Sequence, residues 1–195
     1  MKVLITGFEA FGDLIINPTA LLVEALKKDQ IKIPQGMLIT PVLLPVTFAD
    51  SFKILEARIK EERPDTVLSF GVARGRDAVE LERVAINCID ASIPDNQGYR
   101  PQDERINEKG DAAYFSSLPL RKIESKLREA HIPCRISNSA GTYVCNYLFY
   151  KLMEQVQKTK VKAGFIHMPY EASLSMHEQK RAVSLILDSL CSLPE

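Results

Sequence analysis

One stretch of sequence decides the fold class: Ser137-Asn138-Ser139-Ala140-Gly141-Thr142-Tyr143-Val144-Cys145-Asn146-Tyr147. A short apolar run, Ile132 to Ile136, precedes it, and an apolar run with helical spacing continues to Met153. The small, turn-prone residues between these runs predict a strand, a tight turn and a helix. We expect Thr142 to be the N-cap, which places Cys145 at the third position of the helix.

The predicted position of Cys145 at a helix start affects the acidity of its thiol. The unpaired backbone N–H groups and the dipole of a helix start favour negative charge, so we expect the thiol to lose its proton more easily there. A thiolate is a nucleophile. The alternative is that Cys145 is a small, inert core residue, as most free cysteines on helices are.

Composition excludes several functional classes. The 195 residues carry 25 basic and 25 acidic side chains, and no basic patch or charge run favours nucleic acid or a membrane surface. No apolar run is long enough to cross a bilayer. The four cysteines form no C-x-x-C pair, so zinc is not expected. The first residues, Met1 to Gly7, are typical of a strand, which favours a cytoplasmic protein with reduced cysteines.

Strand and helix patterns alternate along the chain. This alternation predicts a three-layer α/β/α sandwich around a twisted, mostly parallel mixed sheet, formed by one domain over residues 1–195. Asn17-Pro18 and Ser175 mark helix starts. The segment from Ser92 to Leu118 has little periodicity, which is typical of a lid, a binding loop or an interface. The expected strands are 2–6, 37–44, 66–70, 79–90, 134–136 and 162–166.

Several distinctive residues follow the predicted strands. The loop Phe8 to Ile16 carries Phe8 and Phe11, the loop after Phe70 begins with Gly71, and His167 follows the last strand. Ligands bind beyond the carboxyl ends of strands in such folds, so we expect these loops and Cys145 to meet at one edge of the sheet.

A cysteine nucleophile needs an imidazole within hydrogen-bond reach. His167 is the best candidate, because His131 and His177 are expected at helix ends away from this edge. A carboxylate on the other ring nitrogen would orient the imidazole. Glu80 and Glu82 share one face of their strand, and spacing alone does not choose between them. Either glutamate can instead pair with Arg76 or Arg83.

Five motifs, in order over nearly the whole chain, resemble those of the pyroglutamyl peptidase I family of cysteine peptidases. They are Gly7-Phe8-Glu9-Ala10-Phe11-Gly12 with Asn17-Pro18, Glu82-Arg83-Val84-Ala85-Ile86-Asn87, Ile93-Pro94-Asp95-Asn96-Gln97-Gly98, Ser139-Ala140-Gly141-Thr142-Tyr143-Val144-Cys145-Asn146, and Gly164-Phe165-Ile166-His167-Met168-Pro169-Tyr170.

The resemblance implies an activity and a site. It implies removal of an N-terminal pyroglutamyl residue from peptides by a Cys145, His167 and Glu82 triad through a thioester, without cofactor or metal. It also implies a homodimer or homotetramer. Arg76 is a candidate for oxyanion support, or for an ion pair. We expect the substrate pocket to include Phe8, Phe11, Asn17, Gly71, Val72 and Val144.

The sequence departs from the family pattern in two places. The family commonly has glutamine where this chain has Val72, and glycine where it has Arg74. It also usually has a longer loop between Tyr170 and the final helix, where this chain has only Glu171 to Leu174. These departures motivate an alternative, a thiol hydrolase of the same fold acting on another neutral cyclic amide or N-blocked substrate. A further alternative is a non-catalytic small-molecule binding protein in which Cys145 is a packed helix residue.

Overall fold

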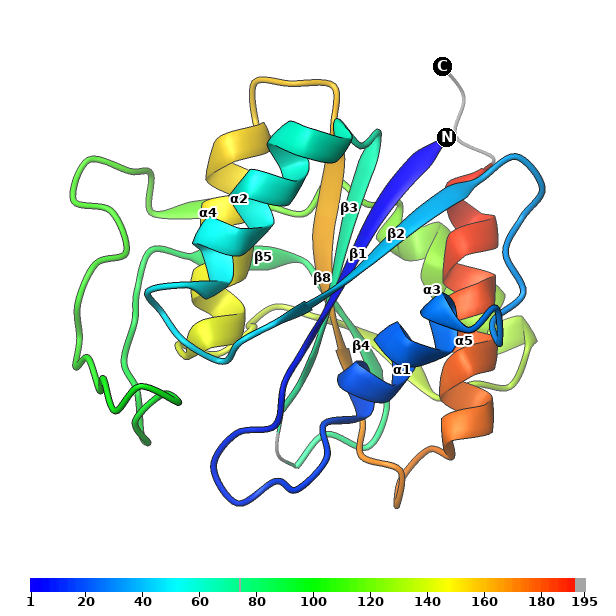
Figure 1. Cartoon of the computed structure of the whole chain (residues 1–195), viewed down its shortest axis with the longest axis horizontal. Helices are drawn as coiled ribbons and strands as arrows, with labels where there is room; N and C mark the ends of the chain where they lie inside the picture. The colour runs from blue at the N-terminus through cyan, green and yellow to red at the C-terminus, as the bar shows by residue number, and fades with distance from the viewer. Residues whose placement is uncertain (74, 192–195) are drawn as a thin grey trace.

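A twisted six-stranded sheet forms the centre of the molecule (Figure 1). The computed structural model describes residues 1–73 and 75–191. The strand order is β2-β1-β3-β8-β4-β7. Four strands run parallel to one another, and two run in the opposite direction. The parallel strands are β1 (Lys2–Phe8), β2 (Leu38–Leu44), β3 (Thr66–Val72) and β8 (Lys162–Met168), and the reversed ones are β4 (Val79–Glu82) and β7 (Cys134–Ser137).

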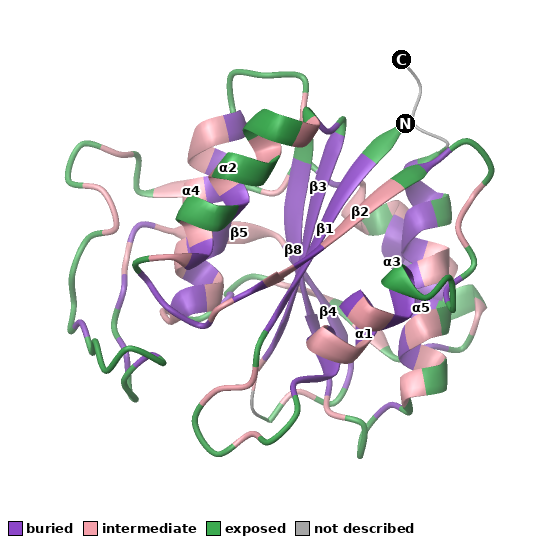
Figure 2. Ribbon diagram, viewed as in Figure 1, coloured by how far each residue is buried: buried purple, intermediate pink, exposed green. Residues whose placement is uncertain are grey.

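Helices cover both faces of the sheet, which confirms the predicted α/β/α sandwich. Figure 1 shows α2 and α4 on one face and α1, α3 and α5 on the other. The helices are α1 (Pro18–Lys27), α2 (Ser51–Glu62), α3 (Leu120–Glu129), α4 (Val144–Val156) and α5 (Met176–Leu190). Each face has its own apolar core, and β3, at the centre, is buried along its whole length (Figure 2). Burial on both faces explains why β3 reads as a continuous apolar run.

The predicted helix starts at Asn17 and Ser175 are confirmed. The Asn17 side chain accepts a hydrogen bond from the Thr19 N–H at 3.0 Å, and Pro18 is the first residue of α1. The Ser175 hydroxyl accepts from the Glu178 N–H, as in a capping box, and it also donates to the Glu178 carboxylate. These local bonds need no distant residue, which is why the sequence reveals them.

The long strand predicted for 79–90 is wrong, because the chain changes sheets at Arg83. The Arg83 N–H donates to the carbonyl of Ser137, the last residue of β7, while the Arg83 carbonyl accepts from the Ser116 N–H. The chain continues as β5 (Val84–Ile86), which pairs with β6 (Ala113–Phe115) in a separate two-stranded sheet. The segment from Ser92 to Leu118, predicted to be irregular, therefore contains one short strand.

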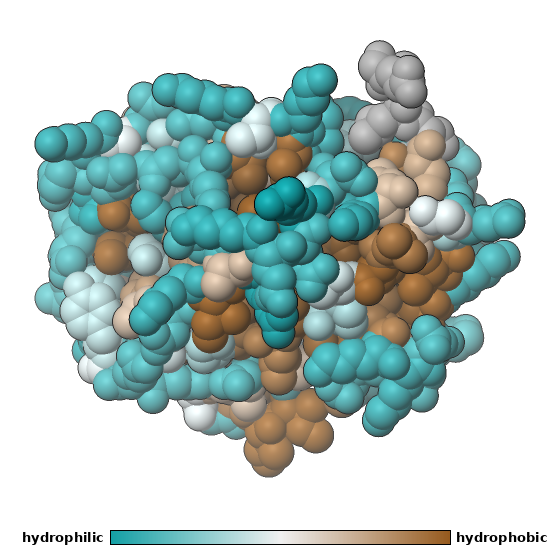
Figure 3. All heavy atoms as spheres, turned by 45° about the horizontal axis from the view of Figure 1, so that its top comes forward, coloured by the Kyte–Doolittle hydropathy of each residue, from teal (hydrophilic) through white to brown (hydrophobic). Residues whose placement is uncertain are grey.

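The surface carries large apolar side chains on several separate elements. Figure 3 shows that the face it draws is largely hydrophilic, with hydrophobic side chains gathered in distinct patches. Ile15 is 90% exposed in the loop after β1, Phe115 is 68% exposed on β6, and Leu38 is 65% exposed on the edge strand β2. Side chains of this size on an edge strand and a loop are candidates for contacts with another chain.

Candidate active site

His167 and Glu82 form a buried pair at the centre of the sheet. His167 lies inside β8, not beyond its end as predicted, and β4 runs beside it in the opposite direction. His167 Nδ1 is 2.7 Å from Glu82 Oε1, and both side chains are almost fully buried. When Nδ1 donates to the carboxylate, the other ring nitrogen, Nε2, is left as an acceptor.

Burial controls the charge of this imidazole. It lowers the pKa of His167 below the usual value of 6.5, the Glu82 hydrogen bond and charge work in the opposite direction, and the charge of Arg76 lowers the pKa further. The ring is therefore neutral near neutral pH, the state in which an imidazole can accept a proton.

Glu80, the other glutamate on this face of β4, has different partners. Its carboxylate forms ion pairs with Arg76 and Arg135, and the Arg135 Nε lies 2.7 Å from Glu80 Oε1. Arg76 also lies 3.2 Å from Glu82 Oε1. The structure therefore distinguishes the two glutamates, since only Glu82 reaches the imidazole. The ion pair that we considered for Arg76 is present.

Helix α4 begins one residue later than predicted and places Cys145 at its second position. Tyr143 is the N-cap, and its side chain makes no capping hydrogen bond. Thr142, the predicted N-cap, donates its hydroxyl proton to Asp90 O at 2.8 Å instead. The Thr142 hydroxyl is therefore engaged by a backbone carbonyl 52 residues away and does not cap the helix. The first N–H groups of α4 still have no intrahelical acceptor and point toward the start of the helix.

The expected fall in the pKa of the Cys145 thiol is wrong. Burial, with a smaller contribution from the Glu82 carboxylate, raises its pKa from 9.0 to about 12, and the charge of Arg76 acts in the opposite direction. Desolvation outweighs the helix start here, although Cys145 is only partly buried and lines a cleft. Cys145 is therefore a neutral thiol in the resting protein, and it must give up its proton when it reacts.

Gly71 makes room for the thiol. A Cβ atom at Gly71 would lie 2.9 Å from Cys145 Sγ and 2.6 Å from the Phe165 ring. Gly71 is also the register partner of His167 in the β3–β8 pairing. The residue predicted to bind substrate thus lies behind the thiol, where the lack of a side chain lets α4 approach the sheet.

Two adjoining cavities meet at Cys145. A cleft of about 230 Å³ is lined by Cys145, His167 and Arg76, with Val72 and Phe11 in its wall. A small apolar cavity of about 10 Å³ adjoins the cleft and shares Phe11, Val72, Tyr143 and Cys145 with it. Its lining contains the remaining predicted pocket residues, Phe8, Asn17 and Val144, together with Val72 and Phe11. The structure therefore brings the predicted catalytic and pocket residues together.

Asn17 lines the apolar cavity but has its polar groups engaged elsewhere. Its amide N–H donates to Glu9 O at 2.9 Å, and its carbonyl oxygen accepts from both the N–H and the hydroxyl of Thr19. Asn17 is only 1% exposed. Its side chain therefore fixes the loop after β1 and leaves the wall of the cavity apolar.

The path of the chain from β7 to Cys145 differs from the prediction. Because β7 runs antiparallel to β3 and β8, its carboxyl end does not lie at the edge shared by the ends of those strands. The residues from Asn138 to Tyr143 instead return the chain to the level of Gly71. Strand direction is set by tertiary packing, so periodicity within β7 does not reveal it.

Three residues that shape the cleft were not predicted from the sequence. Tyr143 lines both cavities, and its hydroxyl donates to Pro94 O at 3.0 Å. Ile93 lines the cleft, and Asp95 behind it is 5% exposed. The Asp95 carboxylate accepts from the N–H groups of Phe48, Gln97 and Tyr99. The Pro94-Asp95 turn signal was the clue, since aspartate at a turn commonly binds nearby backbone.

The structure places two of the features that depart from the family pattern, Val72 and the short loop after Tyr170. Val72 lies in the wall of both cavities. Arg74 falls outside the described residues. In the short loop after Tyr170, Gln179 of α5 donates to Pro169 O and to Leu174 O, so the loop is closed against the helix.

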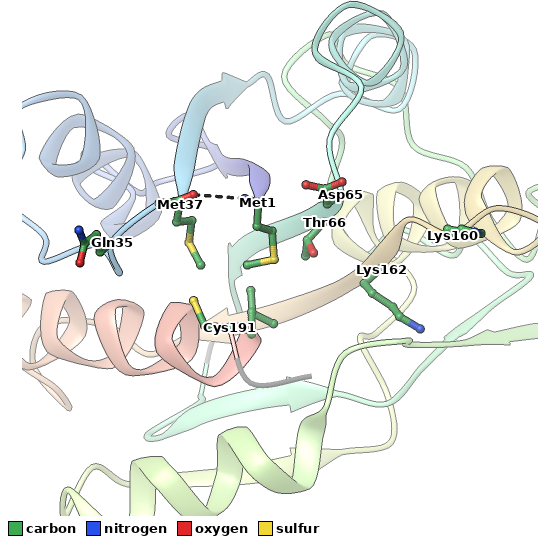
Figure 4. A pocket seen from close by; sticks show the side chains of 10 residues that line it. Met1, Gln35, Met37, Asp65, Thr66, Lys160, Lys162 and Cys191 are labelled. Atoms are coloured by element: carbon green, nitrogen blue, oxygen red, sulfur yellow. Dashed lines mark hydrogen bonds between the residues drawn. The ribbon is translucent and has the colours of Figure 1, made fainter. Parts of the chain in front are cut away.

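A larger cavity of about 660 Å³ lies at the opposite edge of the sheet (Figure 4). The Met1 amino group, which borders it, donates to Gly36 O. Figure 4 shows that Lys160 and Lys162 extend away from Met1 and Cys191, so their charges do not converge. Its described lining includes the Asp65 carboxylate and the Cys191 thiol but no imidazole, unlike the cleft at the other edge.

Two kinds of site are absent from the described residues. No group of three or more His, Cys, Asp or Glu side chains within 1–73 and 75–191 is placed to hold a metal ion. In the same part of the chain, no helix has the length and apolar character needed to cross a membrane.

Comparison with known proteins agrees with this geometry. The model of the pyroglutamyl peptidase family matches residues 1–192. The chain belongs to the pyroglutamyl peptidase family. A pyrrolidone-carboxylate peptidase of Thermosipho africanus is 43% identical over 192 residues, which cover 97% of this chain and 91% of the relative. A second, from Pyrococcus furiosus, is 48% identical over 172 residues, which cover 87% of this chain and 81% of the relative.

Solved structures of pyroglutamyl peptidases share the fold. A mutant pyrrolidone carboxyl peptidase from P. furiosus superposes with a TM-score of 0.91 at 39% identity, and the match covers all of both chains. Pyroglutamyl peptidase I of Bacillus amyloliquefaciens gives a TM-score of 0.91 at 34% identity, covering 98% of this chain and 97% of that one. The family resemblance inferred from the sequence motifs is confirmed.

Proposed function

We propose that this protein is a cysteine exopeptidase that removes an N-terminal pyroglutamyl residue from peptides, with Cys145 as nucleophile, His167 as general base and acid, and Glu82 as the group that orients the imidazole. The observation that carries the proposal is the 2.7 Å contact between His167 Nδ1 and Glu82 Oε1, beside the cleft that Cys145 lines. Membership of the pyroglutamyl peptidase family supports the same assignment.

The first half of the reaction forms a thioester. Because the Cys145 pKa is about 12, the thiol gives its proton to His167 Nε2 as sulfur attacks the acyl carbon of the pyroglutamyl group. The Glu82 carboxylate stabilises the imidazolium that forms. His167 then protonates the nitrogen of the leaving peptide, the C–N bond breaks, and the shortened peptide departs with a free amine.

The second half regenerates the thiol. His167 takes a proton from a water molecule that attacks the thioester, and it returns that proton to sulfur as the C–S bond breaks and pyroglutamate leaves. Negative charge develops on the acyl oxygen in both halves. The first N–H groups of α4, which have no intrahelical acceptor, are the donors closest along the chain to Cys145.

The apolar wall beside Cys145 suits the pyroglutamyl ring chemically. The ring is small and flat, and it is neutral because its nitrogen belongs to a lactam. At about 10 Å³ the small apolar cavity has room for about one water molecule, so the ring would lie in the adjoining cleft of about 230 Å³, where Phe11 and Val72 supply apolar contacts. Among the described residues, no carboxylate lines either cavity, so neither offers a counter-charge to a protonated amine. A free amino terminus would bring an unpaired positive charge into this wall, which is costly.

Turnover of a pyroglutamyl anilide tests the proposal. We expect release of the aniline from the pyroglutamyl compound and none from the prolyl compound, which has a similar ring but a protonated amine. Loss of turnover in Cys145→Ser attributes the release to this site. No turnover of the pyroglutamyl compound by a folded protein, or equal turnover of both compounds, contradicts the proposal.

One observation favours a second candidate, hydrolysis of another neutral cyclic amide or N-blocked substrate. Val72 lines both cavities at a position where the family commonly has glutamine, so a polar side chain is replaced by an apolar one in the wall. A set of N-acyl and lactam-capped anilides distinguishes the two. A kcat/KM that is higher for another cap than for pyroglutamyl favours this candidate.

We also propose that the protein acts in the cytoplasm without cofactor or metal. The described cysteines, Cys88, Cys134, Cys145 and Cys191, are all free thiols, which suits a reducing compartment. Each proton transfer in the reaction above has a donor and an acceptor among Cys145, His167 and water, so the proposed chemistry requires no further group. Activity that survives a strong chelator and lacks any cofactor requirement is the expected result.

A further inference from the structure

The Arg76 guanidinium lies at a junction beside the proposed triad. It forms ion pairs with Glu80 and Glu82, and its Nη2 donates to Ser139 O at 2.9 Å. The contacted Glu82 oxygen, Oε1, is also the one bonded to His167 Nδ1. One carboxylate oxygen is therefore shared by the imidazole and the guanidinium, which compete for it.

Glu80 is built to hold that guanidinium. The Glu80 residue is 5% exposed, and its two carboxylate oxygens face different arginines: Oε2 contacts Arg76 and Oε1 contacts Arg135. Arg135 is held from outside by Asp77, whose Oδ1 lies 2.6 Å from Arg135 Nη2. A glutamine at position 80 would turn a donor toward one of the two arginines, because an amide has only one acceptor oxygen.

We propose that Glu80 is a positioning residue for the reaction: it balances the Arg76 charge and holds the guanidinium so that Glu82 remains available to orient His167. The inference rests on the proposed roles of Cys145, His167 and Glu82.

Electrostatics gives the sign of the effect. Among the described residues, the charged groups that act on the thiol and the imidazole are Glu82 on β4 and Arg76 in the loop before it. Glu80 contacts Arg76, and Arg135 contacts Glu80. Arg76 lowers the pKa of both Cys145 and His167. Without Glu80, the Arg76 charge is less compensated and is drawn more strongly to Glu82. Both changes lower the pKa of the thiol and of the imidazole further.

The rate of Cys145 alkylation tests this sign without any need for peptide turnover. The rate is measured at pH 8.5 by mass spectrometry of the Cys145 peptide, under conditions where only a small fraction of the thiol is ionised. We expect Glu80→Gln to react about threefold faster than wild type, which corresponds to a fall of about half a pKa unit. Arg76→Gln should react more slowly. Glu80→Gln added to Arg76→Gln should produce no further increase, because Glu80 acts through Arg76.

A matched control separates this effect from general loss of charge or structure. Asp77→Asn removes a carboxylate that contacts Arg135 but not Arg76, and we expect the wild-type rate. Cys134, a partly buried thiol on β7, reports on opening of the fold and should keep its rate in every variant. If Glu80→Gln does not fold, Glu80→Asp carries the test, because its shorter side chain weakens the contact and should give a smaller increase in the same direction.

Three results overturn the inference: an unchanged or slower Cys145 rate in the folded Glu80 variant, the same speed-up in the Arg76→Gln background, or a parallel speed-up of Cys134. In an active protein, the acid limb of the kcat/KM profile should also move to lower pH in Glu80→Gln. If no pyroglutamyl substrate is cleaved while the alkylation pattern is as expected, the proposed function fails, and what stands is the coupling of Glu80 to the Cys145 thiol through Arg76.

Discussion

The His167 ring and the Glu82 carboxylate lie 2.7 Å apart on neighbouring antiparallel strands, and neither side chain is more than 1% exposed. Because the strands β8 and β4 fix both backbones, the ring cannot turn without breaking a buried, charge-assisted hydrogen bond. The pair therefore presents Nε2 to the cleft in a constant orientation. This rigidity is what a general base requires before the substrate arrives.

The first prediction compares the two glutamates of β4. Glu82→Gln should lower turnover by up to ~10⁴-fold, because the amide spoils the tautomer and no longer stabilises the imidazolium. The full effect is expected because the thiol is neutral at rest and depends on His167 for activation. Glu80→Gln should remain active, with the acid limb of its kcat/KM profile shifted to lower pH. Turnover and melting temperature are measured for both. The assignment is wrong if Glu82→Gln stays active while Glu80→Gln is folded and inactive.

The second prediction concerns the nucleophile. Cys145→Ser should abolish hydrolysis and leave the fold intact, since oxygen replaces sulfur with little change in volume. Cys88→Ser is the matched control, because Cys88 is also a partly buried free thiol but does not line the cleft. Full activity in Cys145→Ser contradicts the triad, and so does an equal loss in a folded Cys88→Ser variant.

The third prediction concerns Gly71. In Gly71→Ala the new methyl group would lie 2.9 Å from Cys145 Sγ and 2.6 Å from the Phe165 ring, so one of them must move. We expect at least ~10²-fold lower kcat/KM, because a displacement of about 1 Å can cost that much. Overpacking should also lower stability by about 1–3 kcal/mol. Wild-type activity in this variant would show that the thiol has freedom to shift.

Some properties of the site residues could be predicted from the sequence, and others could not. The chemistry of Cys145 and His167, and the shared face of Glu80 and Glu82, follow from residue type and strand periodicity, and the family motifs then favour Glu82. The partner of Thr142 does not follow, because its hydroxyl binds Asp90 O, which is distant in the chain. The high pKa of Cys145 depends in the same way on packing around the thiol.

Strand direction was likewise beyond local patterns. The periodicity of β4 and β7 is the same whether they run with or against β8, and only the packed sheet fixes the choice. The switch at Arg83 arises because its N–H and carbonyl bind different sheets. In contrast, the start of α1 at Asn17 was predictable, since its capping bond spans two residues.

The fourth prediction is that the protein is a homo-oligomer, a dimer or a tetramer. Leu38 on the edge strand β2 and Phe115 on β6 expose large apolar side chains, which another copy can cover. Light scattering over micromolar concentrations measures the mass. Phe115→Ser and Leu38→Ser, tested separately, should identify which surface is used by reducing that mass. A monomer throughout this range would contradict the prediction.

The last prediction concerns stability at high pH. The Cys145 pKa is about 12 in the folded protein against 9.0 for an unperturbed thiol. Between these values the unfolded chain has lost the proton and the folded chain has kept it. Folding stability should therefore fall as pH rises above 9, by at most about 1.4 kcal/mol per pH unit for this group. The contribution is fully present below pH 9, where both states hold the proton.

The Cys145→Ser variant isolates this term, because serine does not ionise in the range. The free energy of unfolding is measured by denaturant titration at pH 8 and pH 10 for wild type and variant. Other groups that titrate there, such as Cys88 and Cys134, are common to both proteins and cancel in the comparison. We expect the wild type to lose about 1 kcal/mol more than Cys145→Ser over this interval. Equal losses would show that the thiol is less enclosed in solution than its position at the start of α4 indicates.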